Sequence, residues 1–199
     1  MYPPKHHQVN DKEKMISVIE HFPLGMMVSA ENSEVFITHI PFIYEESSGN
    51  LVAHIDKNNP HCKMLTENAD VTVVFKGPET YISPSVYKSK DQLPTYNYIT
   101  VHLSGKIKRI DNPERAKETM IEMTRFLEGK EQNFILEKDN AKMGHFVNYI
   151  QAFEIKISNW EGKFKLSQDK SETDIENAKQ QLKNNSAENK GKFIDDMYV

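Results

Sequence analysis

The segment that most constrains the fold is the alternating run NYITVHLSGKIKRI, residues 97–110. Its apolar side chains fall on one face, at Ile99, Val101, Leu103 and Ile107. Thr, His, Ser and Lys occupy the positions between them. Because successive side chains of a strand point to opposite faces, this pattern predicts a half-buried β-strand with a polar second face.

Further strand-like segments precede and follow this run. They are LGMMVSA (24–30), EVFITHIPFIYE (34–45), GNLVAHIDK (49–57), DVTVVFKG (70–77) and QAFEIKISNWEG (151–162). Most are consecutive, separated by short polar turns typical of hairpins, and no parallel βαβ unit is indicated. Six or seven strands with helices at the ends predict an α+β fold, mainly antiparallel β.

The predicted helices have recognisable start signals. Asn10 or Asp11 precedes an amphipathic run that Pro23 ends, and Asn112 with Pro113 opens a longer one. Shorter helices are expected over 141–150 and, from Ser171, over 171–185. We therefore expect one domain over residues 1–183. Residues 184–199 are expected to form a polar, disordered tail, although KFIDDMYV at its end could dock.

Composition excludes several classes of protein. The 25 basic and 29 acidic residues give a net charge of −4, which argues against a dominant nucleic-acid surface but leaves room for a local basic patch on a dimer. No apolar run approaches the length of a membrane span, and the start of the chain lacks a signal-peptide pattern. The single cysteine fits a reducing compartment, so a cytoplasmic location is expected.

Four polar segments are candidates for a ligand site. In VAHIDKNNPHCK, His54, Lys57 and Asn58 lie just before a predicted helix start, a pattern that suits a phosphate. An ordinary capped helix with solvated charges is the alternative, and such caps are the commoner explanation of a segment like this. In FITHIP, Thr38 and His39 point to opposite faces of a strand, and a half-buried structural pair is the alternative.

The other two segments are aromatic or basic. Ser-Pro turns and tyrosines are concentrated in YISPSVYKSKDQLPTYNYITVHLSG, residues 81–105, where flat rings with polar tips could line a planar ligand. Core and loop packing is the alternative. In WEGKFKLSQDK, Lys163 and Lys165 share one strand face and could meet an anion, or could simply protect an edge strand.

In order along the chain, these segments resemble the PaiB-type family of FMN-binding negative transcriptional regulators. The resemblance covers residues 1–183 and is carried by MYPPKHHQV, THIPF, GNLVAHIDKNNPH, FKGPETYISPSVY, PTYNYITVHLSGK and EGKFKLSQDK. It implies a split β-barrel with peripheral helices, similar to pyridoxamine 5′-phosphate oxidases and flavin reductases. It also implies a homodimer with FMN at the subunit interface and with NWEGKFKL near the flavin.

Carried over residue by residue, the resemblance implies a cofactor site. Thr38 and His39 would lie beside the flavin, and His54, Lys57 and Asn58 would hold the phosphate. The wall of the ring or the dimer interface would come from Tyr81, Ser83, Tyr96, Asn97 and Tyr98, and the last barrel strand would add Lys163 and Lys165.

Four functions follow as hypotheses. The first is an FMN-binding regulator, with DNA contacted through Lys106, Lys108, Arg109, Lys163 and Lys165 of a dimer. The second is a small flavin-dependent oxidoreductase or flavin reductase. The third is a haem-binding split barrel with His39, His54, His102 or His145 as axial ligand, and the fourth is a structural dimer with an unused cleft.

Overall fold

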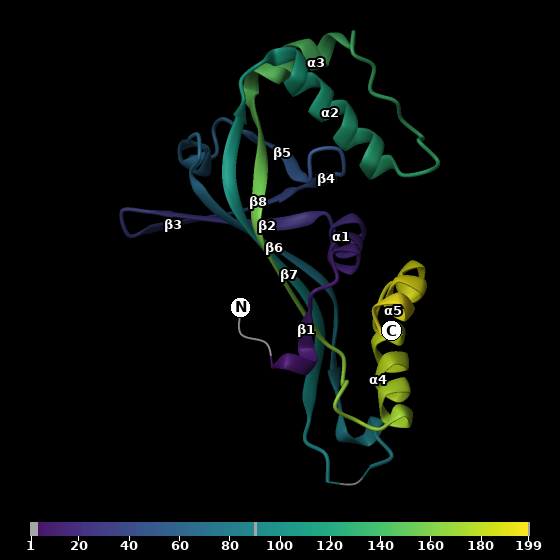
Figure 1. Ribbon diagram of the computed structural model, residues 1–199. Coiled ribbons are helices and arrows are strands. Elements are labelled where there is room, and N and C mark those ends of the chain that lie inside the picture. Colours follow the sequence, from purple (N-terminus) through teal and green to yellow (C-terminus); the bar gives the residue numbers. More distant parts are fainter. Residues whose placement is uncertain (1–3, 90, 199) are drawn as a thin grey trace. The chain divides into compact units, whose positions relative to one another are not determined.

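The computed structural model describes residues 4–89 and 91–198. Its strands form one antiparallel sheet in the order β3-β2-β6-β7-β8-β5-β4, with β1 paired to β8 (Figure 1). The mainly antiparallel α+β prediction is therefore confirmed. The strand bounds are β1 Gln8–Val9, β2 Leu24–Glu31, β3 Glu34–Pro41, β4 Ile43–Glu45, β5 Asn50–Asp56, β6 Asp70–Ile82, β7 Thr95–Ile110 and β8 Ile150–Lys165.

The helices begin where the sequence predicts caps. The Asp11 carboxylate accepts from the amides of Glu13 and Lys14, and Asn112 caps its helix in the same way. The α-helices are α1 Lys12–His21, α2 Pro113–Glu128, α3 Ala141–Phe146, α4 Glu172–Asn184 and α5 Gly191–Met197. Short 3₁₀ turns are η1 Lys5–His7, η2 Pro60–Met64, η3 Pro84–Val86, η4 Val147–Tyr149 and η5 Glu188–Lys190.

The chain divides into two compact units. The central unit comprises residues 23–74 and 103–159. The terminal unit comprises the described residues of 4–22, 75–102 and 160–198. Strands β6, β7 and β8 contribute residues to both units.

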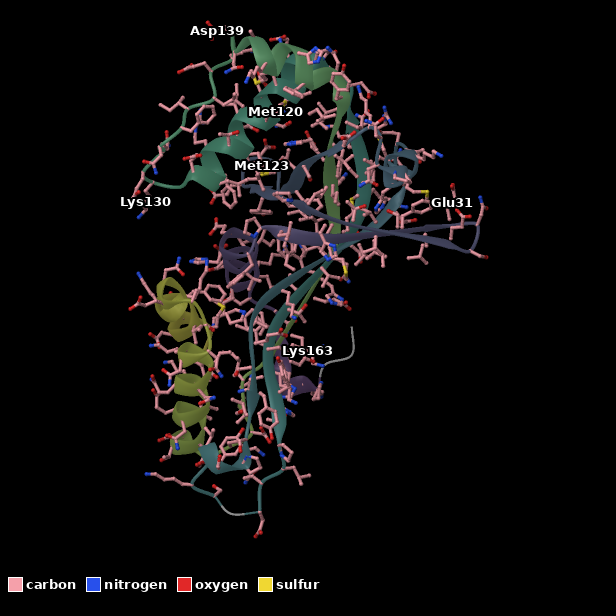
Figure 2. All side chains as sticks on the ribbon, turned by 180° about the vertical axis from the view of Figure 1, so that it is seen from behind. Glu31, Met120, Met123, Lys130, Asp139 and Lys163 are labelled. Atoms are coloured by element: carbon pink, nitrogen blue, oxygen red, sulfur yellow. The ribbon has the colours of Figure 1, made fainter. Side chains whose placement is uncertain are left out.

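The core of the central unit forms between its sheet and α2. Phe42 and Phe153 are fully buried and meet edge to face, with ring centroids 6.3 Å apart. Helix α2 places Met123 in this interior, and Met120 lies half-buried beside it (Figure 2). The register of the β2–β3 hairpin pairs Thr38 with Met27, and this register determines on which face of the sheet the Thr38 side chain lies.

In the terminal unit, β1 pairs with β8 so that Val9 lies opposite Gly162. A Cβ on Gly162 would lie 2.9 Å from the Val9 carbonyl oxygen, so this close approach requires glycine. Helix α4 buries Ala178 against Ile82 and Tyr87, which places the aromatic loop beneath it.

The structure differs from the sequence-based prediction at the end of the chain. Gly191–Met197 forms α5 in the region expected to be a disordered tail, and Phe193, Ile194 and Met197 are buried. These apolar residues recur at helical spacing, so they offset the cost of ordering a polar segment. The domain boundary at residue 183 stays a prediction.

The buried face of β7 is confirmed, since Ile99, Val101, Leu103 and Ile107 are all in the interior. Strand β6 continues beyond the predicted end at residue 77 to Ile82, and β8 continues to Lys165. Within the described ranges, no helix combines the length and apolar character needed to cross a membrane.

Candidate flavin-binding site

In the central unit, one predicted residue, Thr38, joins two that were not predicted. Thr38 Oγ1 lies 3.0 Å from His61 Nδ1 and accepts a hydrogen bond from Asn59 Nδ2 at 3.4 Å. Asn59 also caps η2, because its Oδ1 accepts from the amide of His61 at 2.9 Å. We call Thr38, Asn59 and His61 the β3–η2 group. It combines a hydroxyl, an amide and an imidazole.

His61 is the most enclosed member of the β3–η2 group. It is 1% exposed, and its ring centroid lies 5.8 Å from that of Phe36. Burial lowers the pKa of His61, so its imidazole is neutral near pH 7. Its Nε2 atom is buried and has no hydrogen-bond partner among the described residues. One hydrogen-bonding position of the group is therefore unsatisfied, as it would be if an oxygen-rich ligand such as a phosphate paired with it.

Three other predicted residues of this region do not join the group. His39 points to the opposite, exposed face of β3. Lys57 turns toward η4, where its Nζ donates to the Asn148 carbonyl at 2.8 Å. The backbone amide of Asn58 donates to Asp56 Oδ1 at 2.7 Å, and its side chain lies in the exposed turn before η2.

His54 lies on β5, where it lines a cavity of about 250 Å³ together with Met120 and Met123 of α2. Burial lowers the pKa of His54, and its Nδ1 is buried with no partner in the described part of the chain. The cavity is otherwise mostly apolar. His54 therefore lies among methionine side chains. Among the described residues, no hydrogen bond joins it to the β3–η2 group.

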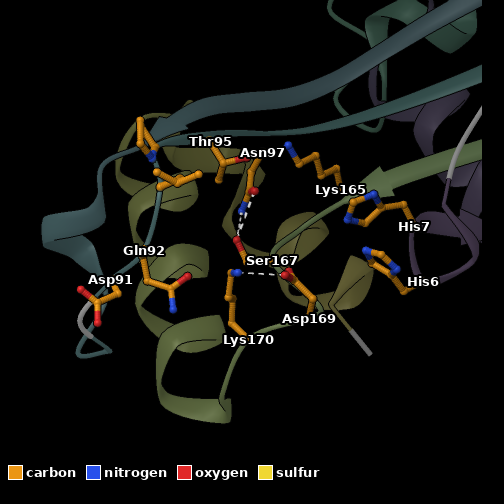
Figure 3. A pocket seen from close by; sticks show the side chains of 12 residues that line it. His6, His7, Asp91, Gln92, Thr95, Asn97, Lys165, Ser167, Asp169 and Lys170 are labelled. Atoms are coloured by element: carbon orange, nitrogen blue, oxygen red, sulfur yellow. Dashed lines mark hydrogen bonds and ion pairs between the residues drawn. The ribbon is translucent and has the colours of Figure 1, made fainter.

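In the terminal unit, Asn97 is fully buried and its Nδ2 donates to Ser167 Oγ at 3.0 Å. The same Ser167 oxygen lies 2.9 Å from the Tyr87 hydroxyl. Nearby on β8, Lys165 Nζ donates to Thr95 Oγ1 at 2.6 Å. Asn97 and Lys165 also line a cavity of about 420 Å³ (Figure 3).

The remaining predicted residues of this unit have other roles in the structure. Lys163 Nζ lies 5.3 Å from the centre of the Tyr98 ring, a cation–π contact. Tyr81 and Tyr96 have exposed rings. Ser83 caps η3 by accepting from the Ser85 amide at 3.3 Å, so its hydroxyl stabilises the Ser-Pro turn.

Asn59 and His61 were missed as site residues, although both lie in the NPH sequence that carries part of the family resemblance. Of the other haem-ligand candidates, His102 is half-buried and burial lowers its pKa, while His145 is exposed beside Tyr149. In the described residues, no three His, Cys, Asp or Glu side chains gather as a metal site would require.

Comparison with known proteins identifies the family of this chain. A family model described as "Putative FMN-binding domain" matches residues 1–159. The Bacillus subtilis (strain 168) protein named "Protease synthase and sporulation protein PAI 2" is 30% identical over 187 residues, covering 92% of this chain and 90% of the relative.

Solved structures share the fold. The FAD and heme binding protein from Mycobacterium smegmatis aligns with a TM-score of 0.65 and 20% identity, covering 85% of this chain and 79% of that one. The flavocytochrome Anf3 from Azotobacter vinelandii aligns with a TM-score of 0.62 and 17% identity, covering 79% and 69%. The predicted split β-barrel fold is confirmed. The chain belongs to the PaiB-type family of FMN-binding domains, and FMN is the cofactor that this membership assigns.

Proposed function

We propose that this protein is an FMN-binding, PaiB-like negative regulator of transcription, and that the flavin phosphate binds at the β3–η2 group. The observation that carries the proposal is the family match over residues 1–159, which includes the whole β3–η2 group. The open Nε2 position of buried His61 supports it independently of the family.

Each residue of the group has a role in this proposal. Thr38 Oγ1 donates its one proton to His61 Nδ1, which keeps the proton of the neutral imidazole on Nε2. His61 Nε2 then donates to a phosphate oxygen, and Asn59 holds the start of η2. Lys57 and Asn58, exposed beside the group, supply a screened positive charge and an amide. Tyr98 and Lys163 make their cation–π contact in the terminal unit and are not part of this group. When bound, FMN supplies reversible one- or two-electron redox chemistry.

The direct test is to titrate flavin-free protein with FMN and to follow flavin fluorescence and the visible absorption bands. Binding near one FMN per chain is expected, with the bands shifted from those of free flavin. Unchanged bands and fluorescence at saturating FMN would contradict the proposal. Repeating the titration with riboflavin isolates the phosphate, because the β3–η2 group should discriminate strongly against the unphosphorylated ring.

We also propose that the protein is a homodimer whose interface includes β3. This edge strand exposes Val35 (62%) and Ile37 (57%) on one face, together with Leu24 of β2. Exposed apolar side chains on a sheet edge favour association with another chain, and a second copy is the simplest occupant. Light scattering coupled to size exclusion would report a dimeric mass. A monomer at micromolar concentration would contradict it.

Direct DNA binding has weaker support. Three of the basic residues named for it form ion pairs with acidic side chains. The nitrogen–oxygen distances are 2.7 Å for Lys106–Asp70, 3.1 Å for Lys108–Glu154 and 3.0 Å for Arg109–Asp111. These acids reduce the positive field that a phosphate backbone would meet. A gel-shift series at increasing salt tests the point. Regulation by direct contact requires binding that falls steeply with salt.

The ion pairing of that surface favours a second candidate, a flavin-dependent oxidoreductase that affects transcription indirectly. It requires NADH- or NADPH-dependent flavin reduction by the FMN-loaded protein. Consumption of either nucleotide above the rate with free FMN would support it. If neither nucleotide is consumed and the gel shift depends on salt, the regulator is favoured over the oxidoreductase.

A further inference from the structure

The cavity of the terminal unit is built from several separate segments. Its walls are η1, the loop 91–94, the start of β7, the end of β8 and the turn that follows β8 (Figure 3). Its volume of about 420 Å³ lies within the range of small-molecule sites. The close-up shows His7, Lys165 and Ser167 around the same space.

His7 is the feature of this cavity that lacks a structural explanation. It is 7% exposed, yet neither Nδ1 nor Nε2 has a hydrogen-bond partner in residues 4–89 and 91–198. Its ring meets that of His6 at a centroid distance of 4.1 Å, a contact that satisfies neither nitrogen. An unpaired buried polar group destabilises a fold, so a ligand that pairs with His7 would recover that free energy.

Charges of both signs surround His7, since Lys165, Lys170, Asp91 and Asp169 line the cavity. Burial lowers the pKa of His7 most, and the charges of His6, Lys165 and Lys163 lower it further, while Asp169 acts in the opposite direction. Asp169 is itself paired with Lys170 at 2.8 Å. Lys165 uses one ammonium N–H for Thr95 and retains two more donors.

We infer that this cavity is a binding site for a small organic anion, with its carboxylate or phosphate on Lys165 and a neighbouring hydroxyl or N–H group on His7. A neutral imidazole offers one donor and one acceptor, so His7 can pair with the acid and with the adjacent donor group. Asn97 and Ser167, already hydrogen-bonded to each other, form a polar floor. The inference does not depend on FMN binding, because it uses none of the residues of the β3–η2 group.

The test uses the full, flavin-free chain labelled at histidine and follows the imidazole signals by NMR. The probes are inorganic phosphate and lactate, each added at constant ionic strength with chloride as the reference anion. Comparison of His7→Phe with the wild-type spectrum assigns the His7 signals. Saturable shifts of the His7 signals are expected, and the stronger probe identifies phosphate or carboxylate as the preferred head group.

Lys165→Met keeps the apolar stem and should weaken binding about ten-fold or more, because it removes a charge-assisted hydrogen bond. Lys163→Met is the matched control on the same strand. Its ammonium stacks on Tyr98 and does not line the cavity, so its effect should stay within about three-fold.

Three outcomes would overturn the inference. The first is the absence of saturable His7 shifts with both probes. The second is equal weakening by the Lys165 and Lys163 substitutions, which would indicate general electrostatic attraction. The third is displacement of the anion by stoichiometric FMN, which would assign the cavity to the flavin. Persistence of the anion signals in FMN-saturated protein would support a separate site, whereas failure to bind FMN leaves this test intact.

Discussion

Each unit contains a buried histidine with at least one ring nitrogen that lacks a hydrogen-bond partner among the described residues. The two histidines differ in how many of their nitrogens are paired. In the central unit, His61 contacts Thr38 Oγ1 through Nδ1, and only its Nε2 lacks a partner among the described residues. In the terminal unit, neither nitrogen of His7 has such a partner. The His7 ring lines a cavity together with Lys165, whose ammonium has two further N–H donors besides the one given to Thr95.

The difference indicates two kinds of polar site. The β3–η2 group is preorganised by its own hydrogen bonds, so a ligand adds one contact to a network that already exists. The His7 cavity has an unmet hydrogen-bonding demand beside the ammonium of Lys165, so its ligand must supply both partners of His7 and a negative charge for Lys165. If this distinction is right, substitutions in one unit should leave the ligand of the other unit unaffected.

The largest expected effect is from Ile37→Glu. A carboxylate on the exposed apolar face of β3 should weaken dimerisation about thirty-fold or more, since interface centres tolerate charge poorly. If the flavin site is completed by the second copy, FMN binding should be lost with the dimer, while anion binding at the His7 cavity persists. Sedimentation velocity and both titrations measure this.

Ile135→Glu is the control for that substitution. It places the same charge on an equally exposed apolar residue of the central unit, in the loop after α2. Dimer mass and FMN affinity should not change. A dimer that survives Ile37→Glu would exclude β3 from the interface.

Next in size is Thr38→Val, which preserves shape but removes the hydroxyl that joins Asn59 and His61. FMN affinity should fall about ten-fold or more, because His61 loses the hydroxyl that keeps its proton on Nε2, where it meets the charged phosphate. Riboflavin affinity should change much less. Thr72→Val removes a comparable half-buried hydroxyl of the same unit, bonded to Ser104, and should leave FMN affinity intact. Equal effects of the two substitutions would argue against a phosphate at the β3–η2 group.

A smaller effect is expected on the pH dependence of stability. Burial lowers the folded-state pKa of His61 and of His7, so the unfolded chain binds the extra proton more readily. The contribution of these two neutral histidines to the free energy of unfolding is complete above the unfolded-state pKa of about 6.5, and it is lost as the pH falls through and below that value. The urea midpoint should therefore decrease from pH 7.5 to pH 5.5.

His61→Phe and His7→Phe should each flatten this decrease, and their effects should add because the residues lie in different units. His39→Phe, on the exposed face of β3, serves as the control. Saturating phosphate should reduce the contribution of His7 and leave that of His61 unchanged. A phosphate effect on the His61 contribution would remove the distinction between the two sites.

The smallest predicted effect is from Lys57→Ala. Its ammonium is exposed and already donates to the Asn148 carbonyl, so its attraction for a phosphate is screened. FMN affinity should fall by about two- to three-fold at moderate salt, and the effect should shrink as salt rises. Lys63→Ala, on η2, is the matched control. A hundred-fold loss would place Lys57 in direct contact with the phosphate.

Local patterns predicted most of the fold. The alternation over 97–110 gave the buried face of β7, and Asp11 and Asn112 marked the starts of α1 and α2. Docking of KFIDDMYV was allowed for, but its helix α5 and the continuation of β6 to Ile82 were not foreseen. Both depend on packing between distant segments, such as Ile82 against Ala178, which no local period encodes.

The site was predicted less completely for the same reason. Thr38 was identified, but its partners lie 21 and 23 positions away and are fixed by the β2–β3 hairpin and η2. His54 was predicted because it lies just before a helix start, yet the packing of α2 places methionines beside it. His7 lies in MYPPKHHQV, which carries part of the family resemblance, but its lack of hydrogen-bond partners becomes apparent only once its burial is known.

The most direct test of the central claim is a crystal structure of the protein grown with FMN. We predict density for the flavin phosphate within hydrogen-bonding distance of His61 Nε2, beside η2. FMN whose phosphate lies away from β3 and η2, for example on Lys165 in the His7 cavity, would contradict the account.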